Sequence, residues 1–310
     1  MFEIRELRHL LSLDEFRHFG RAAKAVGLSQ PALTKSLQRM ELAFGAKLFE
    51  RSSTRVAPTA IGVEVLARSR QLVADAEELK RTVDSLTGVE NGSVAVGIGP
   101  AMAESYTAEA IAEVMRKRPQ SRIAVRVDNW QQLSAWLLAG EIDFYVADIG
   151  EAKIDRRLEY FELPPQRFVW FARRAHPLSR RGKRAVGRNE LLSYPIATPK
   201  MPAWAVEWFA AALGDQGLAG LPRPFPAVEC ESYSLLKQLV LNSDCISAAL
   251  ERTLTQELAD RSVSILNVDA PELTTRAGII RMPQRSLSRT GEELVKAIER
   301  LANAKIRRGK

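Results

Sequence analysis

Apolar residues recur at helical spacing, and on one side only, in residues 30–44 of this chain. At about 100° per residue they form one narrow stripe, which is typical of a helix that packs a single face against a small core. The stripe consists of Leu33, Leu37, Met40 and Phe44, and the opposite, polar face consists of Pro31, Thr34, Lys35, Gln38 and Arg39.

The ends of this helix are marked by residue type. Ser29 is a favourable N-cap, and Pro31 stands in the first turn, where its missing N–H costs nothing. Gly45 is suited to end the helix. An Ala-rich segment, residues 20–26, precedes it, and Gly27 breaks that segment. Two short helices joined by a glycine-containing turn are typical of a helix-turn-helix, whose second helix enters the DNA major groove.

The charge of this region favours DNA as its partner. Residues 16–40 contain five Lys or Arg and no Asp or Glu, and residues 1–60 contain ten against six. Glutamine can bind an adenine edge, and Arg or Lys can bind guanine or phosphate. A solvated helix face is the alternative interpretation, but the coincidence of turn, cap, stripe and one-signed charge favours DNA.

A short polar turn at residues 51–55 follows and is predicted to be a wing. Arginines at its two ends can meet backbone phosphates or reach into a minor groove. The residues predicted to contact DNA are therefore Ser29, Gln30, Pro31, Thr34, Lys35, Gln38, Arg39, Arg51 and Arg55.

Residues 59–86 are predicted to form one long helix with apolar positions spaced alternately by four and three. This spacing is typical of a heptad seam, in which one polar position, Ser69, interrupts the apolar ones. The helix could instead pack on its own domain, but a neighbour of about 58 residues is too small to cover its whole length. Dimerisation is therefore predicted through Val65, Leu72, Ala76, Leu79, Val83 and Leu86.

The first 90 residues resemble the LysR-type transcriptional regulators. The matching segments are ELRHL at 6–10, FGRAAKAVGLSQPALTKSLQRME at 19–41 and GAKLFERSSTRVAPTAIG at 45–62. The resemblance implies a winged helix-turn-helix, a linker helix, and a two-lobed α/β effector domain like periplasmic binding proteins. It also implies double-stranded DNA, a small-molecule effector, further copies of the chain in a dimer or tetramer, and RNA polymerase as partners. His18 and Gly20 depart from the family, which has small hydroxyl residues there.

From residue 92 the pattern changes to ten short apolar segments alternating with five helical ones, which favours parallel α/β sheets. The expected domains are 1–58, 59–88 and 92–310. Within the last, lobe I is expected at about 92–163 and 268–304, and lobe II at about 164–267.

Ligands of open α/β sheets bind beyond the carboxyl ends of strands. That rule selects Pro100, Ala101, Met102, Asn129, Trp130, Thr198, Lys200, Met201, Glu231 and Ser232 as the effector site. Hydroxyls and Lys200 favour an organic anion, and the tryptophan and methionines favour apolar or aromatic bulk. Glu231 opposes an anion, so a ligand with both an amine and a carboxylate is the alternative.

Composition excludes several other classes. The 310 residues are 46% hydrophobic with a net charge of +8, and no apolar run approaches the roughly 18 residues of a membrane span. No signal peptide is recognised, so a cytoplasmic location is expected. Cys230 and Cys245 are too few for a disulfide framework; buried thiols are the favoured interpretation and a redox pair the alternative. The three histidines form no catalytic or metal-binding motif, and His176 is expected in an exposed basic loop.

These features together predict a ligand-responsive, DNA-binding transcriptional regulator that works as a homo-oligomer. No enzyme activity, metal or cofactor other than the organic effector is expected. The alternative is a small-molecule receptor in which the helix-turn-helix motif is spurious.

Overall fold

The computed structural model describes residues 2–51, 56–86, 92–150, 153, 155–181, 184–213, 218, 221, 224–269 and 272–306. The chain divides into two compact units, residues 1–90 with 135–142 and residues 91–134 with 143–310. Among the described helices, none is both long and apolar enough to cross a membrane.

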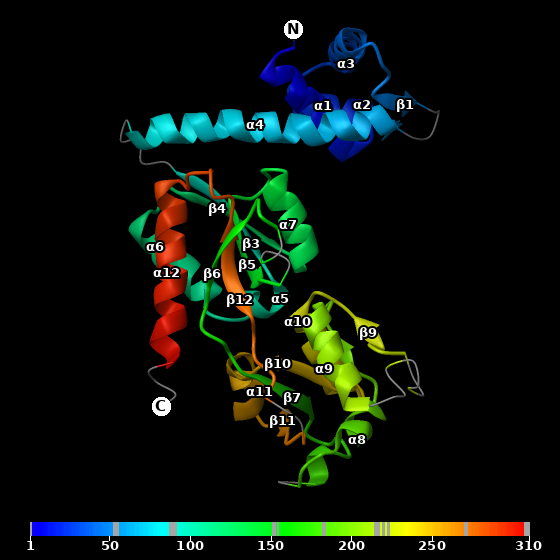
Figure 1. Cartoon of the computed structure of the whole chain (residues 1–310), viewed down its shortest axis with the longest axis vertical. Helices are drawn as coiled ribbons and strands as arrows, with labels where there is room; N and C mark the ends of the chain where they lie inside the picture. Colours follow the sequence, from blue (N-terminus) through cyan, green and yellow to red (C-terminus); the bar gives the residue numbers. More distant parts are fainter. Residues whose placement is uncertain are drawn as a thin grey trace. The chain divides into compact units, whose positions relative to one another are not determined.

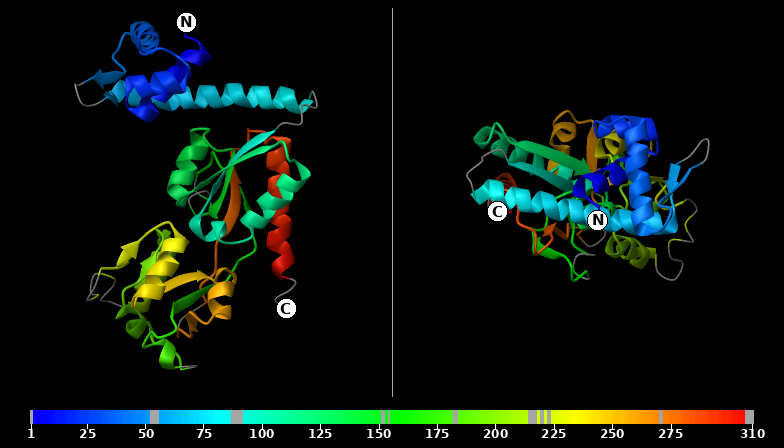
Figure 2. Two further views of the ribbon diagram at one scale, coloured as in Figure 1. Left: turned by 180° about the vertical axis from the view of Figure 1, so that it is seen from behind. Right: turned by 90° about the horizontal axis from the view of Figure 1, so that it is seen from above.

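The first unit contains three short helices, a two-stranded sheet and one long helix. Its elements are α1 (Ile4–Phe16), α2 (Phe19–Ala25), α3 (Gln30–Phe44), β1 (Phe49–Arg51), β2 (Val56–Pro58) and α4 (Ala60–Leu86). Figures 1 and 2 show α4 as a single continuous helix. The predicted helix-turn-helix (α2 and α3) and the predicted long helix are confirmed. Helix α1 is an addition to the predicted elements.

The core of this unit explains why α3 is oriented as it is. Leu33, Leu37 and Met40 are buried against leucines of α1, and Phe44 packs at the edge of the same cluster. Burying each such side chain stabilises the unit by about 1.5–3 kcal/mol. Because the apolar stripe of α3 is used in this way, its opposite face is left at the surface.

The second unit contains the remaining described helices and strands, although the end of α7, from Ala135, is grouped with the first unit. Its larger elements are β3 (Ser93–Ile98), α5 (Pro100–Ala103), α6 (Thr107–Lys117), β4 (Arg122–Val127), α7 (Trp130–Leu138), β5 (Phe144–Asp148), β6 (Glu159–Glu162), β7 (Phe168–Arg173), α8 (Arg188–Leu192), β8 (Ala197–Thr198), α9 (Ala203–Leu213), β9 (Val228–Glu229), α10 (Tyr233–Asn242), β10 (Ser247–Leu250), α11 (Thr255–Ala259), β11 (Val263–Leu266), β12 (Ala277–Arg281) and α12 (Arg289–Ile306). All ten predicted strands are present. Helix α6 occupies the first of the five predicted helical segments, and α5 precedes it as a separate short helix.

Two main sheets define two lobes. Lobe I is built on the five-stranded sheet β4-β3-β5-β12-β6, and lobe II on the three-stranded sheet β10-β7-β11 together with the pair β8-β9. The chain crosses from lobe I to lobe II between β6 and β7, and returns between β11 and β12. Pro164 and Pro165 lie in the first crossing.

The expectation of parallel sheets is wrong for a large part of this unit. Strands β4, β3 and β5 pair in parallel, but β12 is antiparallel to both β5 and β6, and β7 is antiparallel to β10 and β11. The reason lies in the crossings, because β12 enters lobe I directly from lobe II without a crossover helix on the lobe I sheet.

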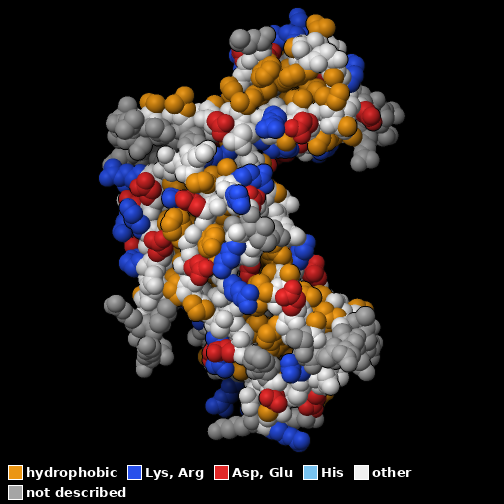
Figure 3. Space-filling model, in the orientation of Figure 1, with side chains coloured by type: hydrophobic (Ala, Val, Ile, Leu, Met, Phe, Trp, Pro, Cys, Tyr) orange, Lys and Arg blue, Asp and Glu red, His pale blue; other side chains and the backbone are white. Residues whose placement is uncertain are grey.

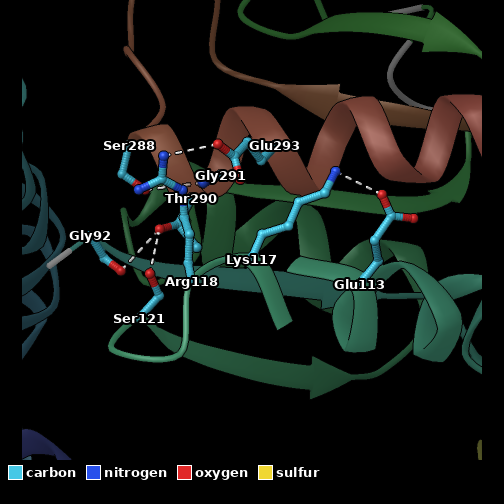
Figure 4. A network of polar contacts seen from close by, with 9 residues as sticks. All are labelled: Gly92, Glu113, Lys117, Arg118, Ser121, Ser288, Thr290, Gly291 and Glu293. Atoms are coloured by element: carbon cyan, nitrogen blue, oxygen red, sulfur yellow. Dashed lines mark hydrogen bonds and ion pairs between the residues drawn. The ribbon is translucent and has the colours of Figure 1, made fainter. Parts of the chain in front are cut away.

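The last helix, α12, is fastened to the beginning of β3, as Figure 4 shows. The Thr290 hydroxyl donates to the Gly92 carbonyl at 3.2 Å, and Ser288 donates to the Ser93 carbonyl at 3.0 Å. Arg118 donates to Glu293 at 2.9 Å, and this hydrogen bond lowers the pKa of the Glu293 carboxyl. The contacts hold α12 beside α6 on one face of the lobe I sheet (Figure 1).

Candidate DNA interface and effector pocket

The outward face of α3 is polar and mostly exposed. Its N-cap is confirmed, since Ser29 Oγ accepts a hydrogen bond from the Ala32 N–H at 3.4 Å. Thr34 is half-buried, and the exposed members of the predicted set are Ser29, Gln30, Pro31, Lys35, Gln38 and Arg39.

These side chains are not equally available. Arg39 forms an ion pair at 2.8 Å with Glu6, whose side chain is only 11% exposed. Within the described part of the chain, Lys35 and Gln38 make no such contact. Lys35 and Gln38 are therefore the side chains of this face most ready to meet a partner, whereas Arg39 must share its guanidinium with Glu6.

Glu41 ties α3 to the first wing strand. It is 5% exposed, and one of its carboxylate oxygens accepts hydrogen bonds from the backbone N–H groups of Leu48 at 2.9 Å and Phe49 at 3.4 Å. Lys47 pairs with the other oxygen at 3.3 Å. Charge-assisted hydrogen bonds of this kind fix the position of β1 relative to α3. Glu41 is not among the residues predicted from the sequence, although an acidic residue on the buried side of a helix is a usable signal.

His18 and Gly20 form a matched pair at the start of α2. His18 Nδ1 accepts hydrogen bonds from the backbone N–H groups of Gly20 at 3.1 Å and Arg21 at 3.3 Å, so an imidazole caps the helix where the family uses a hydroxyl. A Cβ at residue 20 would stand 3.2 Å from His18 Cε1. Glycine therefore leaves room for the larger capping side chain.

Antiparallel pairing of β1 with β2 forms the predicted wing, with Arg51 opposite Val56. The backbone of Arg51 ends β1, but its side chain lies outside the described part of the structure. Arg55 and the rest of the tip, residues 52–54, lie outside the described residues as well. The contacts predicted for Arg51 and Arg55 therefore stay predictions.

Exposed apolar side chains follow one side of α4, and Figure 3 shows hydrophobic side chains at the surface of this unit. Ile61, Leu72, Leu79 and Val83 lie within about 40° of one another around the helix. They are 53%, 43%, 68% and 49% exposed. An exposed apolar stripe of this length is typical of a helix that packs against a partner.

Two seam positions have a different role from the one predicted. Val65 packs against the core of its own unit and Ser69 is buried. The reason is that α1 lies along the first half of α4, where Arg70 pairs with Asp14. Ala76 is half-buried, and the side chain of Leu86 is outside the described part of the structure.

A pocket of about 900 Å³, part of it open to solvent, lies in the second unit. It is lined by residues of both lobes, including eight of the ten predicted effector residues. Those eight are Pro100, Ala101, Met102, Asn129, Trp130, Thr198, Lys200 and Met201.

The structure places the other two predicted residues, Glu231 and Ser232, outside the lining of this pocket. Ser232 is the N-cap of α10 and accepts a hydrogen bond from the Leu235 N–H at 3.3 Å. Glu231 accepts from the Lys200 backbone N–H at 3.3 Å, and burial raises the pKa of its carboxyl. Both side chains are used to build the loops beside the pocket.

The pocket also contains residues that the strand-end rule missed. Trp204 of α9, in lobe II, donates from Nε1 to Asp148 Oδ2 at 2.7 Å, and the Arg276 guanidinium lies 4.7 Å from the centre of its ring. Asp148 and Arg276 belong to lobe I, so Trp204 joins the two lobes across the pocket. Further aromatic lining comes from Phe168, Trp170, Phe209 and Tyr233.

His176 is fully buried, not exposed as expected. Its Nδ1 accepts from the Leu178 N–H at 3.1 Å, its ring packs on Tyr194, and burial lowers the pKa of the imidazole. No group of three metal-ligating side chains suited to a metal ion occurs among the described residues.

The two cysteines stand at opposite ends of the parallel ladder that contains β8. Ile196 pairs with Ile246 on one side, and Thr198 pairs with Glu229 on the other. The register offsets Cys245 from Cys230 by about four residues, which is roughly 13 Å along the strands. A disulfide needs Cα atoms within about 7 Å, so this arrangement favours two separate thiols.

Comparison with known proteins gives this architecture a family. Residues 4–63 match the bacterial regulatory helix-turn-helix protein, lysR family, and residues 87–302 match the LysR substrate binding domain. The chain is 32% identical to the SDS degradation transcriptional activation protein of a Pseudomonas species, over 95% of this chain and 94% of that protein. The chain belongs to the LysR family. It is a DNA-binding transcriptional regulator with an effector-binding domain.

Other proteins similar to this LysR-family chain are also transcriptional regulators or share its fold. The transcriptional regulator CbbR of Xanthobacter flavus is 26% identical over 96% of this chain and 87% of its own. Among solved structures, a full-length OxyR variant from Pseudomonas aeruginosa has a TM-score of 0.69 at 18% identity, covering 96% and 98% of the two chains. CbnR in complex with its target DNA has a TM-score of 0.63 at 16% identity, covering 97% and 100%. The two solved structures show that this chain shares their fold.

Proposed function

We propose that this LysR-family regulator binds an interrupted inverted repeat in DNA as a homo-oligomer. We also propose that a small organic anion is the effector that changes how the oligomer regulates transcription. The observation that supports DNA recognition best is the face of α3, which exposes Gln30, Lys35 and Gln38 while the opposite face fills the core. Gln30 and Gln38 would read base edges, and Lys35, Arg51 and Arg55 would hold phosphates. The other predicted DNA residues, Ser29, Pro31, Thr34 and Arg39, would support contacts at the same face.

The exposed stripe of α4 supports pairing of two chains along Leu72, Leu79 and Val83. Pairing sets the distance between two copies of α3, and a two-fold arrangement of recognition helices matches an inverted repeat. The family resemblance suggests a dimer of dimers, whereas the stripe supports pairing only.

The effector would bind in the pocket of the second unit. Trp130 and Thr198 come from different lobes and both line it, so a ligand there can stabilise one arrangement of the lobes over another. The relative named for SDS degradation supports an apolar anion, because dodecyl sulfate is one. An amine-bearing acid is the competing ligand class.

Thermal-shift screening of the full chain against metabolite pools tests this proposal. A stabilising compound should lose its effect in Thr198→Ala and in Trp130→Ala, while both variants keep their basal DNA binding. Wild-type affinity for that compound in both variants would place the effector site elsewhere.

The remaining parts of the proposal follow from the family. The protein would act in the cytoplasm, contact RNA polymerase at its promoters, and regulate by binding alone, with no catalytic step.

A further inference from the structure

Most of the pocket wall is apolar. Trp130 and Trp170 are less than 10% exposed, Phe209 is 3% exposed, and Met102 and Tyr233 are also buried. Hydrocarbon or aromatic groups gain free energy on leaving water for such a wall, whereas polar groups placed against it lose their hydrogen bonds. The body of a ligand that fits here is therefore apolar.

Among the described residues, the charged side chains that line the pocket are those of Asp148, Lys200 and Arg276. Asp148 is already used in the fold. Its Oδ2 accepts from Trp204 Nε1 at 2.7 Å, and its Oδ1 accepts from the Gly150 N–H at 2.8 Å. A ligand amine would have to compete with both hydrogen bonds, so Asp148 does not favour a cationic ligand.

Lys200 is a weak partner for an anion. Its backbone N–H donates to Glu231 at 3.3 Å, which brings a carboxylate next to the lysine. That negative charge offsets the attraction that an anion would feel at this end of the pocket.

Arg276 is in a different situation. Its guanidinium carbon lies over the Trp204 ring, 4.7 Å from the ring centre, and the residue is exposed. This cation–π contact does not use the N–H donors of the guanidinium as hydrogen bonds. The planar edge of a guanidinium binds a carboxylate or sulfate through two parallel hydrogen bonds.

We propose that the pocket binds an organic acid with an extended or flat apolar body, and that Arg276 holds the acid group while Trp204 orients Arg276. This inference rests on the proposed function, since it takes the pocket as the effector site. It separates the two ligand classes left open there, because Asp148, the carboxylate on the described part of the pocket wall, already accepts two hydrogen bonds within the fold.

Calorimetric titration of the full chain with four soluble probes tests the inference. Octanoate, 1-octanol and octylamine share one tail and differ in the head group, and phenylalanine represents an amine-bearing acid. Octanoate should bind at least about tenfold more tightly than each of the others, as expected for charge-assisted hydrogen bonds.

Variants then identify the residue that holds the acid group. Arg276→Gln should weaken octanoate at least about ten times more than it weakens octanol, and Arg276→Lys should fall between, because lysine keeps the charge but lacks the planar fork. Arg122→Gln removes one exposed positive charge from β4, away from the pocket lining, and should leave the octanoate affinity unchanged.

Three results would overturn the inference: octanoate fails to bind, octylamine or phenylalanine binds more tightly, or Arg276→Gln binds octanoate like the wild type. Failure of the proposed function is distinguishable from these. If a screened metabolite stabilises the chain and Trp130→Ala abolishes that effect, the pocket is the effector site even where the acid class is wrong.

Discussion

The exposed apolar stripe of α4 allows the effect of a substitution on the dissociation constant of the assembly to be predicted. Leu79 is 68% exposed in the single chain, and complete burial of a leucine stabilises by about 1.5–3 kcal/mol. Burying the exposed two-thirds in a seam is then worth about 1–2 kcal/mol per chain, or about 2–4 kcal/mol for the pair. Leu79→Glu removes this term and adds the cost of placing two carboxylates in an apolar contact. The dissociation constant of the assembly should rise by about 30-fold to about 1,000-fold.

Sedimentation velocity over a concentration series measures that change, and gel shift with the operator measures its consequence. Val63→Glu provides the matched control. Val63 is 56% exposed on the same helix, but it lies about 160° around the helix from Leu79 and so faces away from the stripe. The control should keep the native mass. A Leu79→Glu protein of native mass with full operator affinity would refute the role of the stripe.

Three further predictions concern the DNA-binding unit. Gln38→Ala should relax specificity by about 1–3 kcal/mol at one base pair, whereas Arg55→Ala should weaken all sequences together and flatten the salt slope by about one unit, both measured by gel shift over a salt series. Glu41→Gln should lower the free energy of unfolding by about 1–3 kcal/mol and weaken DNA binding, because the charge-assisted hydrogen bonds to β1 are lost. Urea unfolding and gel shift measure the two effects, and the control Glu15→Gln, at an exposed position of α1, should show neither. Burial and nearby guanidinium groups lower the pKa of His9 from its ordinary 6.5, so the unfolded chain takes up the proton first. Stability should therefore be constant above about pH 6.5 and fall as the pH drops below it, and urea unfolding of His9→Gln should show a smaller fall.

The sequence predicted those features that depend on local rules. Helix α3 was defined by the Ser29 cap, the Gly45 terminus and an unbroken apolar stripe, all of which act within a few residues. The ten strands were found because each is a short apolar segment between turn residues. DNA binding followed from the charge of the polar face, which needs no knowledge of distant contacts.

Features that depend on distant contacts were missed. The direction of β12 is set by the return of the chain from lobe II, which strand-by-strand patterns do not encode. Val65 and Ser69 looked like seam residues because the heptad cannot show that α1 covers them. His176 looked exposed because its neighbours are basic, although its ring is buried against Tyr194.

The residues that line the pocket of the second unit were found only in part from the sequence, for a clear reason. The strand-end rule finds residues at or just beyond the ends of strands, and it selected eight that line the pocket. It cannot find Trp170, which lies within β7, or Trp204, which lies within α9. It also cannot distinguish a ligand-binding residue from one that builds a loop, as Ser232 and Glu231 show.

Paired copies of this chain are proposed to read DNA through α3. Selection of bound sequences from randomised double-stranded DNA by the full-length protein is the decisive experiment. We expect enrichment of one interrupted inverted repeat, with an affinity that falls as salt rises and a preference at one base pair that Gln38→Ala relaxes. DNA recovered without any sequence enrichment would contradict this proposal. Enrichment of a single half-site whose base preference Gln38→Ala leaves unchanged would contradict it as well.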